Sequence, residues 1–92
     1  MGIEFLDLQF RLEKSFQTRL PKSWGKEAGD RRPSDITAGD VHAYVCRFLR
    51  QSGQPVPHSS WHRVKLCVAR VDGTSPSEVK ADTRLVKDLD FG

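Results

Sequence analysis

The sequence predicts an all-α domain, a small bundle of three to four helices. Apolar residues recur at helical spacing in three segments, residues 3–16, 37–50 and 60–72. The length of 92 residues suits one small domain, and 37% hydrophobic with 29% charged residues is ordinary globular composition. No apolar run approaches the roughly 18 residues that a membrane span needs. We therefore expect residues 1–92 to form a single domain that is not embedded in a membrane.

The first predicted helix, residues 3–16, carries two apolar rows. One row has the spacing of successive helical turns and consists of Phe5, Leu8, Leu12 and Phe16. The row beside it consists of Ile3, Leu6 and Phe10. Together they are wider than one flat core contact demands. We expect one row to face the core, and the other either to complete the core or to contact a partner.

Residues 17–36 form a long connection punctuated by prolines and glycines. Trp24 interrupts its polarity, which predicts that part of the connection packs on the bundle. The net charge of the chain is +3, and between Arg19 and Arg32 five bases face two acids. This is a basic loop without the longer stripe and interleaved aromatics of a dedicated nucleic-acid binder. A small basic nucleic-acid-binding domain is therefore the least favoured hypothesis.

The second predicted helix begins at Thr37 with a capping-box-like start, in which Asp40 stands where Glu is usual. After a linker at residues 51–58 that contains two prolines, the third helix begins beyond Ser59 and Ser60, either of which can cap it. Gly73 ends that helix as a left-handed residue. The tail predicts a short capped turn at residues 75–78, with proline at its first helical position.

The residues with catalytic or metal-binding potential are few. His42 and Cys46 are four apart on one predicted helix, a spacing that suits two metal ligands or a thiol and its base. No third ligand, orienting acid or oxyanion hole accompanies them, so we expect boundary or buried side chains, no metal and no enzyme. Cys46 and Cys67 are 21 residues apart without a CxxC spacing, which argues against a disulfide scaffold.

Two long stretches resemble the acyl carrier protein family in a rearranged order. The tail matches that family's first helix and long loop, in register at Gly73, Pro76, Val79, Asp82, Thr83, Leu85, Asp88 and Leu89. The segment IEFLDLQFRLEKSFQTRLP is similar to the second helix and its exit, and DITAGDVHAYVCRFL to the start of the last helix. The chain thus resembles a circularly permuted carrier over about four fifths of its length. Residues 3–16 correspond to the second helix, 37–50 to the last helix, 51–58 to a linker and 60–91 to the first helix and its loop.

The family's chemistry depends on a serine that carries a phosphopantetheine arm at the start of the second helix. In this sequence the corresponding position is Gly2, and neither it nor the adjoining Met1 and Gly92 has a hydroxyl group. The resemblance therefore implies a non-catalytic carrier-like module without a cofactor. The alternative is a working acyl carrier, which uses another serine for 4'-phosphopantetheine or is a slice of a longer carrier protein.

The expected role is protein interaction, with enzymes of acyl-chain or phosphopantetheine pathways, in fatty acid or polyketide biosynthesis, as the implied partners. The predicted contact surface combines the second apolar row with an indole and two bases: Ile3, Leu6, Phe10, Trp24, Arg31 and Arg32. The permuted order permits a monomer or a swapped dimer that hinges at residues 51–58. The N-terminus carries acids where a signal peptide would carry bases, which predicts a cytoplasmic protein.

Overall fold

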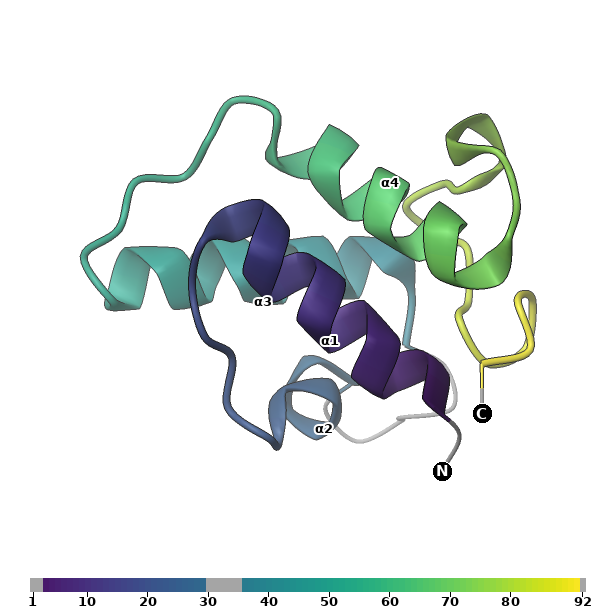
Figure 1. Cartoon of the computed structure of the whole chain (residues 1–92), viewed down its shortest axis with the longest axis horizontal. Helices are drawn as coiled ribbons and strands as arrows, with labels where there is room; N and C mark the ends of the chain where they lie inside the picture. Colours follow the sequence, from purple (N-terminus) through teal and green to yellow (C-terminus); the bar gives the residue numbers. More distant parts are fainter. Residues whose placement is uncertain (1–2, 30–35, 92) are drawn as a thin grey trace.

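The computed structural model describes residues 3–29 and 36–91 (Figure 1). Its elements are α1 (Ile3–Phe16), α2 (Trp24–Gly29), α3 (Ala38–Gln51), α4 (Ser60–Asp72) and a 3-10 turn, η2 (Pro76–Glu78). The first helix of the chain packs against the last, α4, and α3 packs against both α2 and α4. The prediction of a small all-α bundle is confirmed. No helix in the described ranges is long and apolar enough to cross a membrane.

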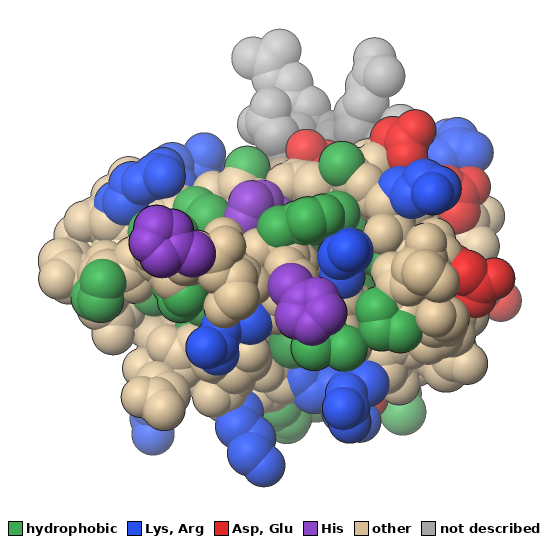
Figure 2. All heavy atoms as spheres, turned by 90° about the horizontal axis from the view of Figure 1, so that it is seen from above, with side chains coloured by type: hydrophobic (Ala, Val, Ile, Leu, Met, Phe, Trp, Pro, Cys, Tyr) green, Lys and Arg blue, Asp and Glu red, His purple; other side chains and the backbone are tan. Residues whose placement is uncertain are grey.

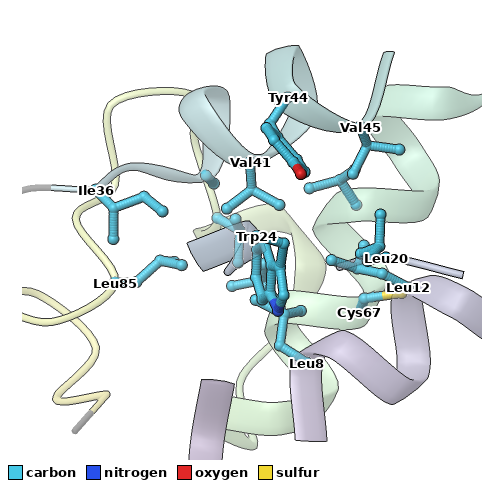
Figure 3. Packing of buried hydrophobic residues seen from close by; sticks show 14 of the residues in the cluster. Leu8, Leu12, Leu20, Trp24, Ile36, Val41, Tyr44, Val45, Cys67 and Leu85 are labelled. Atoms are coloured by element: carbon cyan, nitrogen blue, oxygen red, sulfur yellow. The ribbon is translucent and has the colours of Figure 1, made fainter. Parts of the chain in front are cut away.

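The core is built around the indole of Trp24, which is 2% exposed and lies among side chains from α1, α3 and the C-terminal segment (Figure 3). Of the two apolar rows of α1, the one that faces the core is buried at Leu8, Leu12 and Phe16, and we call it the inner row. Residues 79–91 add further buried side chains, among them Leu85 and Phe91. The core therefore depends on segments that are far apart in the sequence.

The short helix α2 is the main departure from the prediction, which treats residues 17–36 as a connection. The Trp24 amide donates to Pro21 O at 3.0 Å and begins the helix, while indole Nε1 donates to Gln9 Oε1 at 3.2 Å. Burial of the tryptophan stabilises a helix whose two glycines, Gly25 and Gly29, have poor helix propensity. Tertiary packing overrides the local preference here.

The N-terminus of α3 has hydrogen-bond partners for its first amides. Thr37 and Asp40 form the predicted capping box, with both bonds at 3.0 Å. The next amides, of Ala38 and Gly39, donate to Thr83 O and Ala81 O, each at 2.9 Å. A Cβ on Gly39 would lie 2.8 Å from that same Ala81 oxygen, so the close approach requires glycine. The C-terminal segment thus closes over the start of α3.

The N-terminus of α4 is built differently. Ser59 occupies the N-cap position but makes no side-chain cap bond, so the predicted cap is absent, and the first turn holds no acid. The Ser59 hydroxyl instead accepts from Arg63 Nε at 2.9 Å. The other end of α4 is as predicted: Gly73 is left-handed, with φ of 80°, and its amide donates to Ala69 O.

The two ends of the described chain meet at one side of the bundle (Figure 1). The rings of Phe5 and Phe91 pack edge to face with centroids 5.6 Å apart. The start of α1 is therefore held directly against the C-terminal segment.

Candidate interaction surface

The outer face of α1 carries an unpartnered apolar row, which we call the outer row. It consists of Ile3, Leu6 and Phe10, whose exposed fractions are 78%, 51% and 58%. Isolated apolar side chains on a surface are ordinary, but these three share one helix face through their i, i+3 and i+7 spacing. Its spacing alone allows this row either to complete the core or to face outward, and in the structure it faces outward.

A groove of about 550 Å³ adjoins the outer row, between the second half of α1 and residues 18–22. Phe10 lines it together with three cationic side chains, Lys14, Arg19 and Lys22. Its acid, Glu13, accepts a hydrogen bond from the Leu20 amide at 2.7 Å. That bond folds the segment after α1 back along the helix and engages the carboxylate. The groove therefore combines apolar surface with an excess of positive charge.

The remaining residues of the predicted contact surface behave differently from the outer row. The prediction that Trp24 contacts a partner is wrong, because its indole is buried in the core. Arg31 and Arg32 lie outside the described residues, as do Met1, Gly2 and Gly92 at the expected phosphopantetheine position.

The structure brings His42 and Cys46 of α3 together with Ser60 of α4. His42 Nε2 lies 2.8 Å from Ser60 Oγ, and the Cys46 thiol donates to the same oxygen at 3.8 Å. Ser60 is 7% exposed, and burial lowers the pKa of His42. Within residues 3–29 and 36–91 no group of three potential metal ligands occurs. The cluster is a buried polar contact that joins α3 to α4.

The Cys67 thiol and the Tyr44 hydroxyl both have raised pKa values, which favours their neutral forms. Cys46 and Cys67 are both free and buried, and burial raises the pKa of the Cys67 thiol. Tyr44 donates to Glu27 Oε1 at 3.2 Å, and burial together with that carboxylate raises its pKa to about 12. This bond joins α2 to α3. At Cys67 the effect of burial outweighs that of the nearby arginines, so its thiol is not activated as a nucleophile.

Sequence reasoning missed one charged surface. Residues 41–71 contain five Lys or Arg residues, all three histidines, and no Asp or Glu. Figure 2 shows the histidines on one face with Lys and Arg side chains around them, while the acidic side chains lie toward one end and along the edge. Residues 19–32 stand out in the sequence because they contain an excess of bases. Residues 41–71 could have been found by a different signal, namely 31 consecutive residues without Asp or Glu.

Comparison with protein-family models, with curated proteins and with solved structures gives no match.

Proposed function

We propose that this protein is a non-catalytic docking module on a carrier-like permuted bundle, and that it binds a protein partner through the outer row of α1. The observation that carries the proposal is the placement of Ile3, Leu6 and Phe10 on one exposed helix face beside a cationic groove. Burying such a row on association would remove apolar surface from water at about 25 cal/mol per Å².

The occupant that fits this surface is an amphipathic, acidic helix of the partner. Its apolar stripe would cover the outer row, whose i, i+3 and i+7 spacing matches helix-in-groove recognition. Its carboxylates would face the groove cations Lys14, Arg19 and Lys22. The carboxylate of Glu13 already accepts the Leu20 amide, which leaves the cations in excess there.

The acyl carrier resemblance is supported by the way the chain ends meet. In a permuted carrier, the residues before the cut must lie next to the start of the second-helix equivalent. Phe91 packs on Phe5 at the start of α1, and α4 lies against α1. This arrangement is what the reordered sequence requires, and short connections between nearby ends make permutation tolerable.

Binding of designed helical peptides to the full chain tests the docking proposal. We expect a peptide with a leucine stripe and glutamate flanks to bind more tightly than the same stripe with lysine flanks. A double variant, Leu6→Ser with Phe10→Ser, should lose about tenfold or more in affinity, because apolar anchors dominate such interfaces. Its circular dichroism should be unchanged. Lys80→Gln, a charge change away from the groove, is the control, and equal binding by both peptides would contradict the proposal.

The alternative, a working acyl carrier, is tested separately by intact mass. The protein is incubated with coenzyme A and a promiscuous phosphopantetheinyl transferase beside a genuine carrier. A gain of one phosphopantetheine would establish the alternative, and peptide mapping would identify the modified serine among candidates such as Ser59, Ser75 and Ser77. Under our proposal the mass stays unchanged while the genuine carrier gains the arm.

A further inference from the structure

Residues 41–71, which make up most of α3 and α4, carry five Lys or Arg side chains and no carboxylate; the acids of these two helices, Asp40 and Asp72, lie near their outer ends. The ion pairs found in the described ranges are Arg11–Asp7 and Arg84–Asp88, and both lie outside residues 41–71. Cations that have no neighbouring carboxylate keep their full attraction for an external anion. We call the solvent-exposed part of residues 41–71 the acid-free face; it includes the exposed side chains of Arg50, His58, His62 and Arg70 and the half-buried Trp61 and Lys65.

Helix geometry fixes how the members of this face that belong to α4 are arranged. His62 and Arg70 are eight residues apart on α4, so they lie about two turns apart along that helix and about 80° apart around it. One side of α4 carries Trp61 and Lys65, with the Lys65 ammonium 5.8 Å from the indole centroid. From α3, the ring of His42 packs on the same indole with centroids 5.4 Å apart. The indole thus has one cation and one imidazole beside it, while Arg70, nine residues after Trp61, projects from the other side of α4.

The open N-terminus of α4 adds to the positive potential of the acid-free face. Ser59 provides no side-chain cap and the first turn has no acid, so the helix dipole is not neutralised there. His58 and Ser59 beside it are both exposed. The charge of the side chains and the charge of the helix terminus therefore have the same sign.

We infer that the acid-free face binds single-stranded nucleic acid through its phosphate backbone, with Trp61 as the side chain that stacks on a base. A 13-residue helix is about 20 Å long, which spans several nucleotides. Cationic surfaces with interleaved aromatic rings are the usual means of holding single strands without sequence preference. This interaction is independent of the docking function proposed for the outer row.

An anionic membrane surface fits the acid-free face less well. Binding to a bilayer interface requires apolar side chains that insert between lipids. The large hydrophobic side chains that the structure exposes are those of the outer row, which belongs to α1. On the acid-free face the half-buried Trp61 is instead flanked by His42 and Lys65, which suits a planar base better than a lipid chain.

Two charge-matched variants of the full chain test the inference. One is Arg50→Gln, Lys65→Gln and Arg70→Gln on the acid-free face; the other is Lys14→Gln, Arg19→Gln and Lys22→Gln at the α1 groove. Both remove three positive charges. Fluorescence anisotropy would measure binding to a labelled single-stranded oligonucleotide of about 15 nucleotides at low salt. Vesicles of phosphatidylcholine with phosphatidylserine serve as the second probe.

We expect the acid-free-face variant to lose about tenfold or more in oligonucleotide affinity, and the groove variant to stay within about twofold of the native protein. With three phosphate contacts, log K should fall with log salt at a slope of about −2, and the first variant should flatten it. Trp61→Leu should weaken binding about fivefold or more while the salt slope is retained.

Three results would overturn the inference. Equal losses in the two charge-matched variants would mean that net charge alone attracts the oligonucleotide. Tighter binding to the anionic vesicles than to the oligonucleotide would identify a membrane surface instead. Absence of oligonucleotide binding by the native protein at low salt would exclude this role for the acid-free face.

Discussion

The N-termini of α3 and α4 are a natural comparison, because two helices of similar length begin in opposite ways. At α3, Thr37 and Asp40 form a complete capping box, and carbonyls of residues 81–83 accept the next two amides. At α4, Ser59 makes no cap bond and the first turn has no acid. The first terminus is closed by a side-chain cap and the C-terminal segment, whereas at the second the Ser60 amide donates to Pro57 O and no side chain caps the helix. The closed terminus therefore contributes mainly to stability, whereas the uncapped one belongs to the surface for which we propose nucleic-acid binding.

The largest effect should come from filling the close contact at the start of α3. Gly39→Ala places a methyl group 2.8 Å from Ala81 O, so the C-terminal segment must shift and its hydrogen bonds must weaken. We expect a loss of about 1–3 kcal/mol in the free energy of unfolding, measured by denaturant titration. Gly25→Ala is the matched control, because its Cβ would lie 3.8 Å from Phe5 Cδ1 in ordinary contact. If Gly39→Ala left the free energy of unfolding unchanged, the C-terminal segment would be shown to shift without an energetic cost.

Removal of the N-cap hydroxyl compares the two termini directly. Thr37→Ala should lower the free energy of unfolding by about 1 kcal/mol, because it deletes a formed cap bond. Ser59→Ala should change it by only a few tenths of a kcal/mol, because the exposed hydroxyl bonds Arg63 and not the helix amides. Thermal and denaturant unfolding measure both variants. Equal losses would mean that Ser59 caps α4 in solution.

An acid at the N-terminus of α4 should change stability and oligonucleotide binding in opposite directions. Ser59→Asp supplies both a cap acceptor and a negative charge, so stability should rise by about 0.5–1 kcal/mol. The same change places a carboxylate on the acid-free face and should weaken oligonucleotide binding severalfold. Stability and anisotropy are measured on the same preparation. A variant that gains stability without losing affinity would separate the terminus from the binding surface.

The smallest effect concerns the contact between α3 and α4 at acidic pH. Burial lowers the pKa of His42, so below about pH 6.5 the unfolded chain takes up a proton that the folded chain resists. The contribution of the neutral imidazole is complete above that pH and is lost as pH falls toward the lowered folded-state pKa. Denaturant titrations near pH 7.5 and 5 should therefore show a loss of stability that is smaller in His42→Gln. The Asp88 carboxyl does not contribute to the change in stability between pH 7.5 and 5, because its pKa is lowered from an ordinary value near 4.

The sequence predicts those elements whose signals are local. The helix at residues 3–16, the capping box at Thr37 and the left-handed Gly73 each depend on residues within a few turns of one another, and all three are confirmed. The short helix α2 is missed because its stability comes from the burial of Trp24 against distant side chains. The two glycines in this segment have poor helix propensity, so the local sequence favours a loop.

The surfaces follow the same division. Exposure of the outer row could be named as a possibility from its helical spacing, but which row faces the core depends on how α4 packs on α1. The prediction that Trp24 belongs to the contact surface is wrong, since an aromatic residue in a polar loop can pack inward or outward with equal local cost. The acid-free face requires two helices to be side by side before its charges form one surface.

The closure of the C-terminal segment over α3 has a consequence for synthesis of the chain. The amides of Ala38 and Gly39 find their partners only when Ala81 and Thr83 have been made, more than 40 residues later. At about 5–20 residues per second, the nascent α3 waits about 2–9 seconds for that segment. During this interval the capping box of Thr37 and Asp40 protects the start of the helix. Slowing translation between these segments would lengthen the time in which the nascent chain exposes its apolar surface to aggregation.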